Sequence, residues 1–180
     1  MSQFDWTRND LSLKSRDVAF MGAKQRRRVA KRLLGMAFAD LTPVAASMAY
    51  TGSATNNALS NAAVSAGQLL AKDASGNWGP ADTDLSLIAA GGNGLAIALS
   101  TCAATGQPIV ILADGNSGTI NLGCTVIAGA IYIGSSVAGK IYELPDATHP
   151  TTGWFTSIVG IGISATFVQL ILRCGGVAHA

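Results

Sequence analysis

The stretch FTSIVGIG at residues 155–162, followed by TFVQLILR at residues 166–173, decides the fold of this chain. Both stretches are rich in Ile, Val, Thr and Phe, the residue types that favour β-strands. Four similar segments precede them, at residues 108–113, 119–122, 130–134 and 140–144. Short strands that follow one another about every ten residues, with Gly, Pro, Asp and Ser between them, predict a mainly β protein. The expected fold is a small antiparallel β-sandwich or barrel.

The pattern predicts a β-domain over residues 67–180. Residues 68–72 form an apolar burst that leads into the turn-like segment DASGN at 73–77, and residues 95–99 alternate Leu or Ile with Ala. Residues 46–66 are small, polar and without a period, so they are interpreted as a linker or loop-rich segment. Residues 1–45 form a separate unit, a basic N-terminal arm.

The charge of the chain is concentrated in that arm. Nine of the twelve Lys and Arg residues fall in residues 1–32, where the charges sum to +6, whereas residues 33–180 sum to −4. Charged residues make up only 12% of the chain, against about 25% in an average soluble domain. Such a composition indicates binding or assembly, and it predicts that other subunits cover much of the surface.

The arm contains two kinds of candidate partner-binding residue. Its aromatic and aliphatic residues have no regular period, which is typical of an extended segment on another surface. Between residues 23 and 38, apolar residues fall on one side at helical spacing and basic residues cluster on the other, which predicts one amphipathic helix that ends before Pro43. The candidates are Phe4, Trp6, Leu11, Leu13, Phe20, Arg26, Arg27, Arg28, Lys31 and Arg32.

Several roles are open for the predicted helix. It could neutralise phosphates of DNA or RNA, lie on a membrane surface, or dock on a protein partner; the simplest alternative is a solvated basic face whose apolar side packs on the chain's own body. Docking on a protein is favoured, because no aromatic residues are interleaved with the basic ones and no nucleic-acid-binding fold is recognisable.

Three further features limit the function. The uncharged stretches are interrupted by polar residues, Gly or Pro, so no membrane-spanning segment is expected, and the acidic residues near the N-terminus do not fit an export signal. Cys102, Cys124 and Cys174 are odd in number and widely spaced, which predicts three free thiols and no zinc site. Synthesis in a reducing cytoplasm fits this pattern.

No catalytic, cofactor or metal site is predicted. The only histidines, His149 and His179, fall at loop or tail positions, and Glu143 is the single Glu. A calcium site at Asp73, Asp82 and Asp84 is not expected, because these residues lack the spacing of a calcium-binding loop. The glycine-bearing segment 91–94 is a turn and not a nucleotide-binding loop. We therefore expect a protein that is not an enzyme.

The strand segments carry a resemblance to a known family. GQPIVIL at 106–112, SGTINLG at 117–123, GAIY at 129–132 with AGKI at 138–141, and the two stretches quoted first resemble the pattern of tailed-bacteriophage capsid decoration, or cement, proteins. The resemblance covers residues 107–177. It implies a small β-domain on the outside of the capsid, often a homotrimer, whose N-terminal arm reaches across neighbouring subunits.

The sequence thus predicts a non-enzymatic virion protein on the capsid surface, which binds the major capsid protein and itself. Two other hypotheses stay open. One is a nucleic-acid-binding virion protein that uses the basic arm; the other is a neck, tail or fibre-base protein, structural or carbohydrate-binding. The carbohydrate-binding variant would need exposed aromatic rings, for which Trp78 and Trp154 are the candidates.

Overall fold

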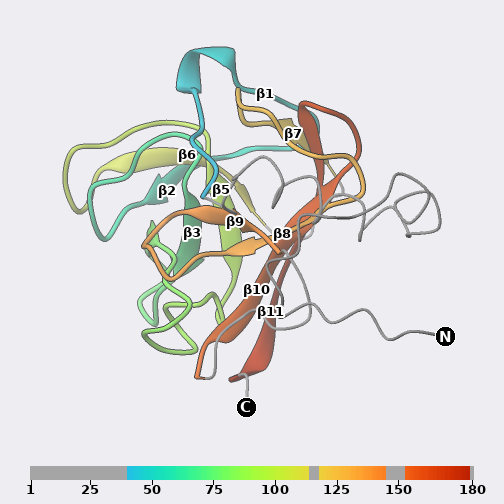
Figure 1. Ribbon diagram of the computed structural model, residues 1–180. Coiled ribbons are helices and arrows are strands. Elements are labelled where there is room, and N and C mark those ends of the chain that lie inside the picture. Colours follow the sequence, from blue (N-terminus) through green and yellow to red (C-terminus); the bar gives the residue numbers. More distant parts are fainter. Residues whose placement is uncertain (1–39, 114–117, 145–152, 179–180) are drawn as a thin grey trace, which may run out of the picture. The chain divides into compact units, whose positions relative to one another are not determined.

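A computed structural model describes residues 40–113, 118–144 and 153–178 (Figure 1). The chain divides into two units, residues 1–38 and residues 39–180. The predicted arm helix lies outside the described residues. In the second unit the prediction of a mainly β protein is confirmed, since eleven strands form two antiparallel sheets. The only described helix is a single 3-10 turn, Ala45–Ser47.

The larger sheet, sheet A, has six strands in the order β1-β7-β11-β10-β8-β9. Its long strands β10 and β11 form a hairpin at the centre of the sheet, and all its pairings are antiparallel. The bounds are β1 Ala49–Tyr50, β7 Thr119–Asn121, β8 Ile131–Gly134, β9 Ile141–Glu143, β10 Phe155–Gly162 and β11 Phe167–Ala178.

The smaller sheet, sheet B, has five strands in the order β2-β6-β5-β3-β4. The bounds are β2 Thr55–Leu59, β3 Leu69–Lys72, β4 Trp78–Pro80, β5 Leu95–Ala98 and β6 Pro108–Ala113. The predicted turn at 73–77 joins β3 to β4: the Asp73 carboxylate accepts hydrogen bonds from the backbone N–H groups of Ser75 and Asn77. This is the ordinary role of an Asp that begins a tight turn.

The two sheets share one apolar core, so the arrangement is sandwich-like. Sheet B contributes Leu69, Leu95 and Ile97 to it, and sheet A contributes Tyr132 and Leu170, among others. Both sheets have distinct edge strands and do not close into a barrel, so the barrel alternative is not realised. The alternation of side chains along each strand explains which residues enter this core.

A second, smaller core covers the outer face of sheet B. In β5, Leu95 and Ile97 point into the shared core, whereas Ala96 and Ala98 lie in the outer cluster. Val64 bridges to Cys102 above the sheet, so the chain lays its own loops over this face. Small Ala side chains on β5 leave room for that layer. The buried residues of the outer cluster are Val64, Leu70, Trp78, Ala96, Ala98, Cys102, Ile109 and Ile111.

The segment 46–66, interpreted from sequence as a linker or loop-rich, is part of both sheets. It supplies β1, which pairs with β7, and β2, which pairs with β6, and its last residues help to cover sheet B. The chain before it is also tied to the body: Leu41 N–H donates to Ile141 O at 2.7 Å, and Val44 N–H donates to Leu122 O at 2.8 Å.

Candidate interaction surface

The structure places none of the arm residues that the sequence suggested as partner-binding. Phe4, Trp6, Leu11, Leu13, Phe20, Arg26, Arg27, Arg28, Lys31 and Arg32 all lie outside the described residues. The described part of the chain instead shows a candidate surface that sequence reasoning missed. It is the outer face of sheet A, on the side away from the shared core.

Isoleucines from three neighbouring strands lie on this face. Ile131 of β8 lies directly opposite Ile161 of β10. On β11 the residue opposite Ile161 is Gln169, and Ile171 comes two residues later. The chain neighbours of Ile131 and Ile171, namely Tyr132, Leu170 and Leu172, belong to the shared core, so the alternation of a strand turns these two isoleucines outward. Ile161 lies opposite Ile131 and therefore on the same face. Each of the three is 39% exposed. We call Ile131, Ile161 and Ile171 the isoleucine face.

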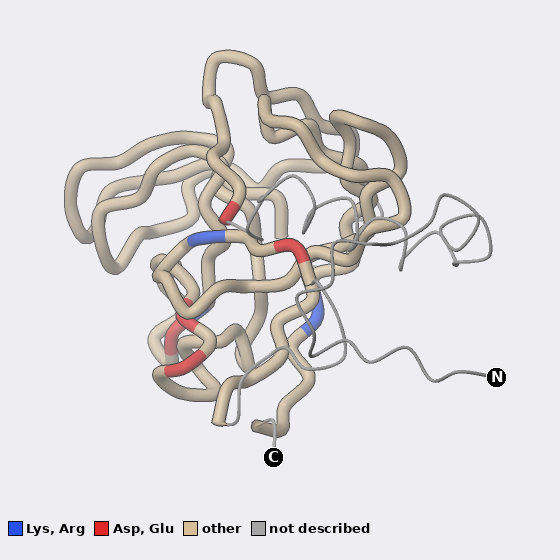
Figure 2. Tube along the Cα trace, viewed as in Figure 1, with Lys and Arg blue, Asp and Glu red and all other residues tan. Residues whose placement is uncertain are grey.

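Charge is sparse on and around this face. The only Lys and Arg residues among residues 40–113, 118–144 and 153–178 are Lys72, Lys140 and Arg173, and Figure 2 shows that most of the described body carries neither basic nor acidic residues. Arg173 is the one that shares β11 with Ile171. The three exposed isoleucines, with Gln169 opposite Ile161 and the buried Ile133 two residues beyond Ile131, form a candidate protein contact site.

A loop at one end of the sandwich adds a second exposed apolar group. Between β4 and β5 the chain turns several times, and it presents Leu85, which is 74% exposed, with Leu87 and Ile88 beside it. Backbone bonds anchor the loop to sheet A, since Thr83 O accepts from Phe155 N–H at 2.8 Å. The Ser157 hydroxyl donates to Ala90 O further along. The exposed side chains therefore sit on a fixed loop.

Asp82 and Asp84 stand at the base of this loop. Partial burial raises the pKa of Asp82 to about 6, with a further contribution from the neighbouring Asp84. The pair has no third ligand, because the described residues contain no group of three His, Cys, Asp or Glu side chains placed to hold a metal ion. The Oγ1 of Thr83, between them in sequence, is buried without a hydrogen-bond partner in the described part of the chain.

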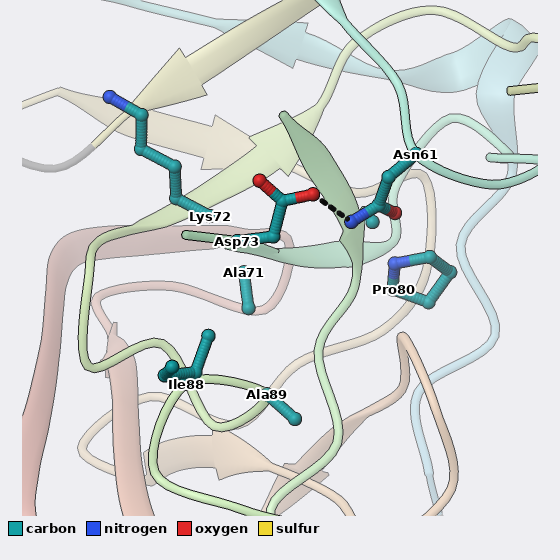
Figure 3. A pocket seen from close by; sticks show the side chains of 8 residues that line it. Asn61, Ala71, Lys72, Asp73, Pro80, Ile88 and Ala89 are labelled. Carbon is teal, nitrogen blue, oxygen red and sulfur yellow. Dashed lines mark hydrogen bonds between the residues drawn. The ribbon is translucent and has the colours of Figure 1, made fainter. Parts of the chain in front are cut away.

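A cavity of about 190 Å³ lies beside the β3–β4 hairpin, lined by Asn61, Ala71, Lys72, Asp73, Gly79, Pro80, Ile88 and Ala89 (Figure 3). Its one carboxylate is already engaged. Asp73 accepts a hydrogen bond from the Asn61 side-chain amide at 2.9 Å besides the two turn N–H groups, and the Asn61 bond is the largest cause that lowers the pKa of Asp73. The Lys72 amine extends over the Trp78 ring, 5.7 Å from its centre. These contacts hold the hairpin, so the cavity offers little unused polar chemistry.

Two of the remaining ionisable side chains of the described residues lie side by side on β9. Glu143 lies opposite Tyr132 in the β8–β9 pair and is 4% exposed. The pKa of the adjacent Tyr142 is raised, first by burial and then by the negative charges of Asp40 and Glu143. His149 and His179 lie outside the described residues.

The tryptophans and cysteines of the body have structural surroundings. Trp78 is only 7% exposed and packs in the outer cluster of sheet B, which removes it as a carbohydrate-stacking ring. Trp154 is half-buried. Cys102, Cys124 and Cys174 are free thiols in the structure, as predicted.

Comparison of the chain with protein-family models, with curated proteins and with solved structures gave no match. No helix in the described part of the chain is both long enough and apolar enough to cross a membrane. A function is therefore inferred from the fold and its exposed surfaces.

Proposed function

We propose that this protein is a non-enzymatic structural component of a tailed-phage virion, which decorates the capsid and stabilises it by binding across major capsid protein subunits. The observation that carries the proposal is the isoleucine face. A domain that covers the outside of one sheet with its own loops, yet leaves three isoleucines of the other sheet exposed, has a surface suited to burial against another protein.

Thermodynamic linkage between binding and assembly explains how such a protein would stabilise a capsid. A protein that binds the assembled capsid but not its dissociated subunits stabilises the assembly in proportion to its occupancy. Burial of the isoleucine face supplies apolar contact area, worth about 25 cal/mol per Å² before the costs of association. In this proposal the basic arm adds a second attachment, through the anchors Phe4, Trp6 and Leu11, on a neighbouring subunit. The protein acts as a homo-oligomer on the capsid surface.

The test is binding to purified phage particles. We expect the full chain to co-sediment with particles and to be accessible to antibody on their outside. Replacing Ile131 and Ile161 together by Lys should weaken binding by at least about a hundredfold, because two charges would be buried in an apolar contact. Val137→Lys, at an exposed position in the β8–β9 turn, is the matched control and should bind normally. Unaltered binding of the double variant, with normal thermal unfolding, would contradict the proposal.

The nucleic-acid-binding alternative makes a different prediction. It depends on the arm, since the body offers only three scattered basic residues in its described part. Replacing Arg27, Arg28, Lys31 and Arg32 by Gln should then reduce the affinity for DNA or RNA and make it less sensitive to salt. The log–log slope becomes shallower by about 0.9 for each phosphate that is no longer neutralised. A protein partner held mainly by apolar burial should tolerate the same change.

A further inference from the structure

The described body begins with an extended segment that is held at both edges of sheet A. We call residues 40–52 the strap; in Figure 1 it is the blue to cyan stretch that carries the 3-10 turn and β1. Near its start, Leu41 N–H donates to Ile141 O of β9, and near its end, Thr51 N–H donates to Thr119 O of β7 at 2.9 Å. Backbone hydrogen bonds therefore attach the strap at its two ends.

The strap buries little of its own surface. None of residues 40–52 is buried, and Val44 and Tyr50 are exposed although both are large and apolar. Leu41 and Met48 are the strap residues that pack against the shared core. Segments with few buried apolar contacts open at a lower free energy than the core strands of the same protein. The strap should therefore be able to leave its site while the two sheets stay folded.

The surface under the strap fits the backbone of the strap closely. A Cβ at Gly118 would collide with the carbonyl of Thr51, and a Cβ at Gly123 would collide with the carbonyl of Val44. Glycine at such positions is typical of sites that another backbone approaches. Between them, the hydroxyls of Thr51 and Thr119 lie 3.2 Å apart. We call β7 with Gly118 and Gly123 at its two ends the strap site.

An empty strap site would be an exposed sheet edge. Without β1, β7 would keep β11 on one side and have no described strand on the other, next to the fully buried side chains of Ile120 and Leu122. Such an edge readily pairs with another extended segment. The segment whose fit to this site the structure displays is the strap, and every copy of the chain carries one.

Two further features favour a strap from a neighbouring copy as the occupant. Residues 41–54 carry no charged side chain, so like charges do not oppose the approach of two copies at this place. In the proposed function the arm, which directly precedes the strap, is attached to a neighbouring subunit. An arm held there would carry the strap toward that neighbour.

We infer that neighbouring copies of this chain exchange straps, so that residues 40–52 of one copy occupy the strap site of another. Each strap then makes the same contacts that it makes in its own chain, which is why an exchange of this kind costs little and still links the copies. The inference rests on the proposed function for the attachment of the arm. It adds to that function the element that joins the subunits of the homo-oligomer.

A mixed-disulfide experiment on the full chain tests the exchange. One preparation carries Thr51→Cys and the other carries Thr119→Cys; because the two hydroxyls are in contact, the two sulfur atoms should meet whenever a strap is in place. The preparations are refolded together from urea at high protein concentration and treated with a mild oxidant. We expect a disulfide between the two chains, which peptide mapping assigns to positions 51 and 119. Each preparation alone should lack this bridge.

Two glycine variants of the Thr119→Cys chain provide the matched controls. Gly118→Ala blocks the strap site, since the three atoms nearest to the new Cβ all belong to Thr51 and Gly52, and it should lower the yield of the bridge at least about fivefold. Gly175→Ala should leave the yield unchanged, because its Cβ meets nothing closer than Thr156 O at 3.5 Å. A chain that carries both cysteine substitutions should close the bridge within itself in dilute solution, which shows that the two positions can pair.

The inference is overturned if the mixture forms no bridge between chains, or if Gly118→Ala leaves that bridge intact. A full chain that stays monomeric at high micromolar concentration in sedimentation velocity overturns it as well. None of these readouts requires a capsid, so the exchange can fail while the proposed virion role stands.

Discussion

The outer faces of the two sheets differ in how far their apolar side chains are buried. On sheet B, the small side chains of Ala96 and Ala98 leave room for a layer that includes Val64, Trp78 and Cys102. The central strands β3 and β5 are therefore buried on both faces. On sheet A the equivalent face carries large β-branched side chains, and Ile131 and Ile161 stay partly exposed. A chain that can cover one sheet with short loops has the means to cover the other. The difference is the reason why we assign the outer face of sheet A to the proposed partner.

The largest expected effect tests this difference directly. Ile111→Ala, in the outer cluster of sheet B, should lower the free energy of unfolding by about 2–5 kcal/mol, because it leaves a cavity in a packed layer. Ile161→Ala on the isoleucine face should cost less than about 1 kcal/mol, since its side chain loses little burial. Urea unfolding of both variants measures the contrast. Equal losses would mean that the two faces are equally buried in solution.

The second prediction concerns the edge of sheet A. Removing residues 1–39 should leave the body folded, whereas removing residues 1–45 should cost a further ~1–3 kcal/mol, because it deletes the backbone bonds of Leu41 and Val44 and part of the packing against the core. Thermal unfolding of the two truncated proteins distinguishes them. If both unfold at the same temperature, the 40–45 segment does not protect β9, and this edge of sheet A is open in solution.

The third prediction concerns the loop between β4 and β5, which hydrogen-bonds to sheet A through Thr83 O and Phe155 N–H. The pKa of Asp82 is about 6 in the folded protein against 3.8 for an ordinary Asp. Between these values the folded state binds more protons than the unfolded chain, so the free energy of unfolding should fall as pH rises from about 4 to about 6. Asp82→Asn should flatten this part of the profile. The effect should be about 1 kcal/mol or less, since Asp82 is only partly buried and solvent screens its interactions.

Melting temperatures at several pH values measure the profile. Asp73→Asn provides a contrast of opposite sign: hydrogen bonds lower the pKa of Asp73, so its contribution is present above the ordinary Asp pKa and is lost as pH falls through the lower folded value. A profile that Asp82→Asn leaves unchanged would show that the loop does not hold this carboxyl in a partly dry position.

The smallest effect concerns thiol reactivity and leaves stability unchanged. Cys102 is buried in the layer over sheet B, whereas Cys174 is half-buried on β11 of sheet A. At submicromolar concentration Cys174 should react with a thiol reagent at least about tenfold faster than Cys102, because the reagent reaches a half-buried thiol more readily than a buried one. Peptide mapping after timed labelling measures both rates. Similar rates would indicate that the cover of sheet B opens readily, and an intrachain disulfide would contradict the free-thiol prediction.

The sequence predicted the central strands well because their pattern is local. Residues 108–113 and 155–162 form β6 and β10 with the predicted bounds, since each combines β-branched residues with clear turn signals at its ends. β11 runs past the predicted end at Arg173 to Ala178, because pairing with β10 continues to Phe155. Neither Gly175 nor Gly176 has a strand propensity that would have shown this.

The rest depended on contacts between distant parts of the chain. β1 and β2 have the sequences AY and TNNAL, with no period, and they are strands only because β7 and β6 pair with them. The isoleucine face could not be predicted from the sequence either. The alternation of apolar and polar residues shows that a strand has two faces. Which of them is covered depends on segments that are distant in the sequence and pack over it. The arm candidates from Phe4 to Arg32 stay predictions, because they lie outside the described residues.

The nested pairing of the N-terminal strands has a consequence for how the chain folds. Asp40 bridges to Tyr142, Tyr50 pairs with Ile120, and Thr55 pairs with Ile111. Each of these N-terminal residues therefore pairs with a residue that is synthesised much later. On the ribosome, residues 40–59 would therefore emerge long before their strands can form, and the sheets should close from the β3–β6 region outward. Such non-local closure is slow, and it leaves hydrophobic strands available to chaperones and to other nascent copies while it lasts.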